Sequence, residues 1–336
     1  MVRISMRQCS KAASSSAAAA AEFLQRTSKA GSFVQEQFLD PNQLQKLSLT
    51  LGRPTLYKSL RIDLKPPPQG TPLPPGYHLA YFTPSGCEQE LGLDGTDRTV
   101  NPPHPFTRRM WAGGSLHWVR DNLLKVGQTV RETTEVMSAI PKTTREGEEM
   151  IVVGVKKTFE NDAGIALVDT RNWLFRKEIT NPQPPSEKQK SIQLPKGTIT
   201  RDHCQSPVSL FRFSALTFNA HKIHYSREWC RDVEGHRDIV VHGPLNLINM
   251  LDLWRDNQEA GDHVIPQSID YRATSPLYAG DRYRAVMEKG ENGHADNLSI
   301  YTPSGAVAMR GKITTFYNYL RPFSNSYNIS SIRMGL

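Results

Sequence analysis

The stretch FSALTFNAHKIHY (residues 213–225), followed shortly by VVHGPL (residues 240–245), determines how the rest of the chain is interpreted. The first stretch places an amide, two imidazoles and a phenol within a few residues, directly after an apolar run. The second is typical of a strand end, a glycine turn and the start of an apolar helix over residues 245–254. Backbone N–H groups at a helix start can polarise a carbonyl oxygen, and a nearby base can then remove the adjacent proton. Together the two stretches predict chemistry on an acyl group.

Length and composition are those of a soluble globular protein of one or two domains. The chain has 336 residues, of which 38% are hydrophobic and 22% are charged. No apolar run approaches the roughly 18 residues of a membrane span, so we expect none. The four cysteines, Cys9, Cys87, Cys204 and Cys230, include no C-x-x-C pair. This spacing indicates reduced thiols rather than a disulfide framework or a zinc ribbon.

The net charge of +8 is unevenly distributed along the chain. Residues 1–31 hold five Lys or Arg residues and the single acid Glu22, which accounts for half of the excess. The remaining surplus is modest and compatible with an acidic carrier protein or a phosphate-bearing ligand. The sequence has no basic stripe and no recognised binding motif, so a nucleic-acid partner is not expected.

Residues 1–34 have the composition of a mitochondrial transit peptide. They are rich in Ser, Ala, Arg and Lys and include the run SSSAAAAA (residues 14–21). The alternative is a disordered tail with accidental bias. A secretory signal is disfavoured because no continuous, strongly apolar core follows the basic start. We therefore predict localisation to the mitochondrial matrix and expect this segment to lie outside the fold.

Residues 35–180 are expected to form an N-terminal domain without a catalytic motif. Residues 150–159 and 165–175 are predicted to be two strands of a hairpin, joined by the turn NDAG (residues 161–164). The pair Gly113-Gly114 is predicted to be a turn that opens a segment of apolar spacing. The Pro-rich, polar residues 181–196 are predicted to be a linker to a C-terminal domain over residues 197–336.

Three landmarks of the first domain recur in the second at offsets of roughly 130–150 residues, far above the periods of solenoid repeats. The recurring pairs are VGQTVR (residues 126–131) with AGDRYR (279–284), the turn at residue 164 with PSG (303–305), and Gly113-Gly114 with Gly243-Pro244. This echo predicts a duplicated fold within one chain.

Several of these segments carry a family resemblance. The segments are RRMWAGG (residues 108–114), LKVG (124–127), FSALTFNAHKIHY (213–225) and VHGPL (241–245). In this order they resemble the MaoC-like hot-dog dehydratases and hydratases. They are closest to the branch of hydroxyacyl-thioester dehydratase type 2 and mesaconyl-CoA hydratase-like proteins. The resemblance implies an α+β double hot-dog of two antiparallel sheets, each wrapped around a central helix. It also implies a hydro-lyase that dehydrates 3-hydroxyacyl thioesters and hydrates enoyl thioesters.

The reaction implied by the resemblance assigns roles to four residues. His224 is the candidate base, since an imidazole titrates near working pH, and the Gly243 N–H is the candidate donor to the thioester oxygen. Asn219 precedes His224 by the spacing of the family's Asp–His pair. The wider family resembles D-x-N-P-x-H and the type 2 branch T-x-N-x-H-x-I-H. An amide cannot exchange a proton, so either the protonic role passes to His221 or to His224 alone, or the register differs by a residue.

The remaining candidates are predicted to bind substrate. Tyr225 either contacts substrate or packs beside the acyl tunnel, and Pro244 lies in the glycine turn. His242 contacts substrate, orients that turn or caps the helix. His221 and His224 have no third ligand at metal-binding spacing and H-E-x-x-H is absent, so neither metal nor cofactor is expected.

Three functions remain open at this point. The first is the (R)-3-hydroxyacyl-acyl-carrier-protein dehydratase of mitochondrial type II fatty acid synthesis. The second is a CoA-thioester hydratase of the mesaconyl type, for which an extra Arg or Lys in the pocket would hold the distal carboxylate. The third is a hot-dog protein that only binds acyl thioesters. The expected partner is an acyl thioester of acyl-carrier protein or CoA, and a homodimer of double hot-dogs is possible.

Overall fold

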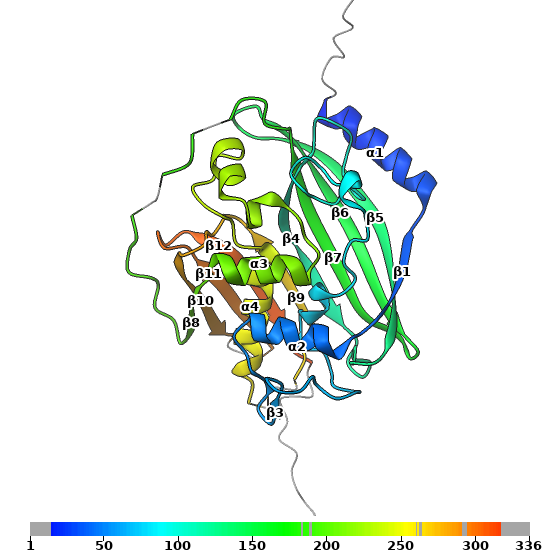
Figure 1. The fold of residues 1–336 in the computed structure, drawn as a ribbon, viewed down its shortest axis with the longest axis vertical. Helices are drawn as coiled ribbons and strands as arrows, with labels where there is room; N and C mark the ends of the chain where they lie inside the picture. The colour runs from blue at the N-terminus through cyan, green and yellow to red at the C-terminus, as the bar shows by residue number, and fades with distance from the viewer. Residues whose placement is uncertain are drawn as a thin grey trace, which may run out of the picture.

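Ten strands form one antiparallel sheet in the computed structural model, which describes residues 15–316 except 183, 188–189, 260, 262–263 and 291–293 (Figure 1). The first half contains β1 (Phe33–Phe38), β4 (Arg108–Trp118), β5 (Thr129–Thr143), β6 (Glu149–Asn161) and β7 (Gly164–Arg176). The second half contains β8 (Ile199–Cys204), β9 (Ser268–Ala273), β10 (Arg282–Lys289), β11 (Ala295–Tyr301) and β12 (Val307–Thr314). The order along the sheet is β1-β5-β6-β7-β4-β9-β12-β11-β10-β8.

The strand order is equivalent when read from either edge of the sheet. β1 and β8 form the edges, while β4 and β9 pair antiparallel in the middle. Each edge strand is followed by a helix, α2 (Pro41–Thr50) after β1 and α3 (Pro207–Leu216) after β8. The molecule is therefore an α+β double hot-dog, and the two sheets expected from the sequence are joined into one.

Two of the three predicted echoes occupy equivalent places in the halves. Gly127 (φ 89°) and Gly280 (φ 78°) each lie two residues before a strand, β5 and β10 respectively. Gly164 (φ 98°) and Gly305 (φ 82°) turn the hairpins β6–β7 and β11–β12. Glycine adopts these positive φ angles without a steric penalty, which explains why the echo survives at these positions.

The third echo is wrong, because Gly113 and Gly114 lie inside β4 and not at a turn. They pair with Arg272 and Tyr271 of β9. A Cβ on Gly113 would lie 2.4 Å from the carbonyl oxygen of Tyr271, and one on Gly114 would lie 1.9 Å from that of Thr170. The glycines thus permit close approach of neighbouring strands where the two halves join.

Helix α4 (Gly243–Asp256) is the central helix of the second half and begins where the sequence predicts. It is buried along nearly its whole length, and the larger hydrophobic core forms around it. The shorter elements are β2 (Thr55–Tyr57), β3 (Leu60–Arg61), three 3₁₀ helices (Tyr77–Ala80, Glu88–Glu90 and Lys222–His224) and a π-helix (Trp229–Val233). Within the described residues, no helix is long and apolar enough to cross a membrane.

Helix α1 (Ser16–Ala30) corrects the expectation that the residues before 35 lie outside the fold. It packs against β5 and β6 (Figure 1). Its Phe23 is fully buried in a second, smaller core. The Ser16 backbone N–H and hydroxyl both donate to Glu149 Oε1, at 2.9 and 3.0 Å. The Ala-rich composition that resembles a targeting peptide is equally that of a strong helix former with one apolar face.

Candidate active site

The stretch at residues 213–225 folds as the end of α3, a tight turn and a 3₁₀ helix. Phe218 takes the left-handed conformation (φ 48°), which is uncommon for a residue with a side chain. Asn219 Oδ1 accepts a hydrogen bond of 3.1 Å from the His221 backbone N–H and so closes the turn. The 3₁₀ helix Lys222–His224 then places the His224 ring against that of His242, the residue that precedes α4.

His224 has the tautomer that a general base requires. Its Nδ1 lies 2.8 Å from the carbonyl oxygen of Val240, which can only accept a hydrogen bond. Nδ1 therefore carries the proton and Nε2 carries the lone pair in the neutral ring. Burial lowers the pKa of His224 to about 4, because the charged ring would lose its hydration. The imidazole is thus neutral at physiological pH and able to accept a proton.

The His242 ring packs against the His224 ring and does not line the cavity. Its ring is fully buried and stacks on that of His224 at a centroid distance of 3.6 Å. His242 Nε2 lies 2.9 Å from Ser214 Oγ, while its side chain makes no capping hydrogen bond to α4. Of the three roles considered from the sequence, orienting the turn is the one that this placement favours.

Gly243 is the first residue of α4, and its N–H has no partner within the helix. Gly243, Pro244 and Asn246 line the cavity, and Asn246 Oδ1 is buried without a hydrogen-bond partner among the described residues. Trp111 of β4 packs directly on the glycine: a Cβ there would lie 2.9 Å from Trp111 Cγ. The helix start is therefore held in place by a side chain of the first half.

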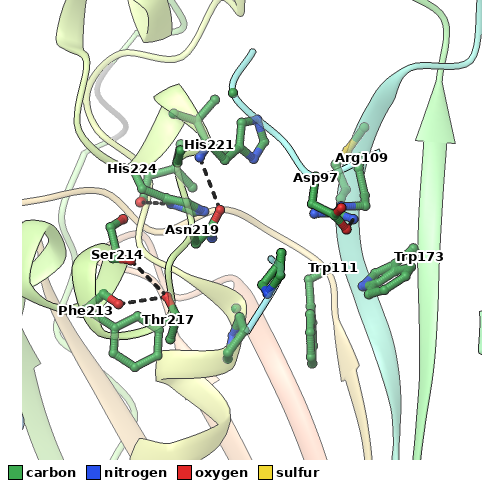
Figure 2. Close-up of a pocket in the computed structure, with 18 of the residues that line it drawn as sticks. Asp97, Arg109, Trp111, Trp173, Phe213, Ser214, Thr217, Asn219, His221 and His224 are labelled. Carbon is green, nitrogen blue, oxygen red and sulfur yellow. Dashed lines mark hydrogen bonds and ion pairs between the residues drawn. The ribbon is translucent and has the colours of Figure 1, made fainter. Parts of the chain in front are cut away.

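A cavity of about 1460 Å³ brings the predicted residues together between the two halves. The predicted residues on its wall are Asn219, His221, His224, Tyr225, Gly243 and Pro244. Figure 2 shows Asn219, His221 and His224 on one side, with Arg109 and Trp111 of β4 across from them. All predicted site residues except His242 thus face one space.

The first-half wall of the cavity carries cations that sequence reasoning missed. Arg109 is largely buried, lies 3.7 Å from Asp97 Oδ2 and stacks its guanidinium over the Trp173 ring at 4.9 Å. Desolvation is the main reason that the pKa of Arg109 is lowered. Its charge is therefore only partly compensated within the protein.

Deeper in the same wall lie two ion pairs, one between β5 and β6 and one within β7. Lys157 contacts Glu132 at 2.6 Å, and Arg171 contacts Asp169 at 2.6 Å. Lys157, Arg171 and Glu132 line the cavity, and one oxygen of each carboxylate has no hydrogen-bond partner in the described part of the chain. These residues come from three strands, so no local pattern in the sequence announces them.

Asp94 is a further residue that sequence reasoning missed, and it approaches residues 213–225 from the first half. Its Oδ2 lies 3.6 Å from His221 Nε2, and its carbonyl oxygen accepts a 2.7 Å hydrogen bond from the Lys222 backbone N–H. More than a hundred residues separate Asp94 from these partners, so only the fold could reveal the contact.

Several known sequences are similar to this chain. The family described as hydroxyacyl-thioester dehydratase type 2 matches residues 76–279. Mesaconyl-C(4)-CoA hydratase of Chloroflexus aurantiacus is 30% identical over 256 residues, covering 74% of this chain and 87% of that protein. The mitochondrial hydroxyacyl-thioester dehydratase type 2 of Schizosaccharomyces pombe is 26% identical over 312 residues, covering 84% and 98%.

Solved structures with the same fold are more distant in sequence. A MaoC-like dehydratase from Phytophthora capsici superposes with a TM-score of 0.60 at 14% identity, covering 85% of this chain and 95% of that one. HtdX of Mycobacterium tuberculosis gives a TM-score of 0.55 at 12% identity, covering 85% and 100%. At these identities the likeness shows the fold, and it confirms the predicted MaoC-like architecture.

Proposed function

The chain belongs to the hydroxyacyl-thioester dehydratase type 2 family and is a hydro-lyase. From this premise we propose that it is the (R)-3-hydroxyacyl-acyl-carrier-protein dehydratase of mitochondrial type II fatty acid synthesis. The observation that carries the chemistry is that neutral His224 and the Gly243 helix start line one cavity.

The proposed reaction uses the site as follows. The thioester oxygen accepts a hydrogen bond from the Gly243 N–H, and His224 Nε2 removes the proton at carbon 2. The negative charge that develops on the thioester oxygen is stabilised by the helix start. The C3–O bond then breaks, and the departing hydroxide takes up the proton that His224 removed, delivered on the side of Asn219 and His221, and leaves as water. Hydration is the same sequence in reverse.

The mitochondrial assignment is supported by the composition of residues 1–34 and by a relative that is itself named mitochondrial. Because α1 is part of the fold, the proposed targeting signal overlaps a structural element. The full chain with a fluorescent tag at its C-terminus should be found in mitochondria. Removal of residues 1–14 tests whether the targeting signal depends on those residues or begins after them. A full-length tagged protein found only in the cytosol would refute the assignment.

The enzymatic test compares carriers and chain lengths. Purified protein is mixed with crotonyl and longer enoyl thioesters of CoA and of acyl-carrier protein, and the absorbance of the conjugated double bond is followed. The fatty-acid role predicts a higher kcat/KM for carrier-protein thioesters. A preference for CoA thioesters would contradict it. Light scattering of the same sample tests the further proposal that two chains form a homodimer.

A second candidate function is a CoA-thioester hydratase for short dicarboxylic acyl groups. Arg109, Lys157 and Arg171 line the cavity, and guanidinium groups recognise carboxylates well. This candidate predicts that an enoyl-CoA with a free distal carboxylate has a lower KM than crotonyl-CoA. Arg109→Gln should then raise KM for the carboxylate substrate alone. Equal effects on both substrates would remove this candidate.

A further inference from the structure

A loop of the first half, residues 92–97, is docked on the catalytic stretch of the second. Lys222 donates from its backbone N–H to the Asp94 carbonyl oxygen and from Nζ to that of Leu93, both at 2.7 Å. Gly95 (φ 81°) approaches so closely that a Cβ would lie 2.0 Å from the Ala220 carbonyl oxygen. The loop is thus fixed against the residues between Asn219 and His224.

Within this loop the two oxygens of the Asp94 carboxylate have different partners. Its Oδ1 accepts hydrogen bonds from the Thr96 N–H at 3.0 Å and from Thr96 Oγ1 at 2.7 Å. These bonds orient the group and direct Oδ2 toward His221 Nε2, 3.6 Å away. Asp94 and His221 are 9% and 8% exposed, so water screens their interaction only weakly.

Residues 213–225, which carry His221 and His224, include no acidic side chain of their own. The wider family resembles D-x-N-P-x-H, but here Asn219 stands where that pattern has its acid. Desolvation, followed by the charges of His224, Arg109, His236 and Arg108, lowers the pKa of His221 well below its usual value. These influences all oppose protonation of His221, and the Asp94 carboxylate is the acidic group in contact with its ring.

We propose that Asp94 is a positioning residue that acts through His221. On the proposed dehydration, His221 is neutral at rest, with its Nε2–H directed to Asp94, and its Nδ1 passes the proton that His224 removed from carbon 2 to the hydroxide that leaves carbon 3; the rings of His221 and His224 are in contact, with centroids 5.5 Å apart. The carboxylate stabilises the imidazolium that forms during this transfer and fixes the tautomer before and after it. A negative charge absent from position 219 is thereby supplied by the other half of the molecule.

The variant Asp94→Asn tests this because an amide keeps Oδ1 for Thr96 but removes the charge and the acceptor oxygen that faces His221. We expect kcat for dehydration to fall roughly tenfold or more, within the range of acid–base contributions, while KM changes little. The acid limb of the kcat–pH profile should move to lower pH, since His221 in the variant takes up a proton less readily. An unchanged profile would overturn the proposal.

Two further variants separate this role from a structural one. Thr96→Val removes a hydrogen bond to Asp94 but keeps the charge, so it should not move the pH profile; a matching shift would mean that loop order alone is responsible. His221→Gln should lower kcat, and adding Asp94→Asn to it should cost less than a further twofold. A full multiplication of the two losses would show that Asp94 does not act through His221.

A readout independent of turnover keeps the proposal testable if the proposed function fails. The His221 ring is titrated by NMR in the wild-type chain and in Asp94→Asn. The substitution should shift the His221 titration to lower pH, and an unmoved titration would contradict the contact. Absence of turnover in the wild-type protein with every thioester would sink the proposed function while leaving this measurement intact.

Discussion

His224 is held by a hydrogen bond at one ring nitrogen and by stacking on His242, and the two contacts predict how it can be replaced. In His224→Asn the amide can still donate to the Val240 carbonyl oxygen, but no base remains at the position of Nε2. We expect kcat to fall about 10²-fold or more while the melting temperature changes little. Turnover assays and thermal unfolding of the same preparation check this.

The comparison variant is His224→Ala, which also leaves the Val240 carbonyl oxygen without its donor. It should lose activity and stability together, because a buried unpaired acceptor costs about 1–3 kcal/mol. Near-normal turnover in His224→Asn would mean that the base is a different residue.

At the level of single residues, the sequence predicts the location of the site but not its full composition. His224, Gly243 and Asn219 belong to local patterns, so spacing alone brings them to attention. Asp94 and Trp111 reach the site from a loop and a strand of the first half. Trp111 lies in a segment that carries the family resemblance, but that segment does not show that its ring packs on Gly243. Their roles depend on the pairing of the halves, which no short pattern encodes.

At the scale of elements, the position of the first turn of α4 against β4 depends on Gly243 having no side chain. In Gly243→Ala the new methyl group would meet the Trp111 ring, so either α4 or β4 must shift. We expect kcat/KM to fall at least tenfold, since misplacement of a polarising N–H by a fraction of an ångström weakens it. Steady-state kinetics with crotonyl-CoA measure the effect.

A compensating variant distinguishes this clash from a general helix effect. Combining Gly243→Ala with Trp111→Leu makes room for the methyl group and should recover part of the lost activity relative to Trp111→Leu alone. Further loss in the double variant would contradict the packing explanation.

Helix α1 predicts a sharp boundary for truncation of the N-terminus. A chain that begins at residue 15 keeps the whole helix and should unfold at a temperature close to that of the full chain. A chain that begins at residue 32 uncovers the smaller core, including Phe106, Ile151 and Phe175, and should be unstable or insoluble. The unfolding temperatures of the two truncated chains and of the full chain check this prediction.

The point variant Phe23→Ala provides a gentler test of the same contact. Removal of a fully buried phenylalanine costs about 3–5 kcal/mol. An unfolding free energy unchanged by this substitution would show that α1 does not stabilise the sheet.

The elements also show where sequence patterns mislead. The hairpin turns at Gly164 and Gly305 are predicted well, because a tight turn itself requires a residue with positive φ, whatever the rest of the fold is. Gly113-Gly114 is mistaken for a turn because the same residue type also permits close packing between strands. Helix α1 is mistaken for a detachable segment because alanine-rich composition does not reveal which surface the helix covers.

At the scale of the whole molecule, buried histidines predict a loss of stability in acid. Burial lowers the pKa of His203 and of His224 to about 4, and it also lowers the pKa values of His221 and His242 well below the usual value for histidine. Unfolded chains bind protons at these rings below about pH 6.5, whereas the folded protein does not. Stability should therefore fall as pH drops from about 6.5 toward 4, by up to about 1.4 kcal/mol per pH unit for each ring.

Denaturant unfolding at several pH values measures this slope. His203 stacks on Tyr283 away from the cavity, so His203→Phe removes one titrating ring and leaves the active site in place. The variant should show a shallower dependence on pH than the wild-type chain. An identical slope would mean that His203 does not contribute.

The pairing of β4 with β9 joins two similar halves within one chain, and this affects how such a protein can evolve. In an assembly of two identical subunits, every substitution is made twice, so a gain in one place is accompanied by its copy in the other. Fusion into a single polypeptide removes that obligation. One repeat is then free to lose its own reactive groups and to become a supplier of loops and walls for its neighbour.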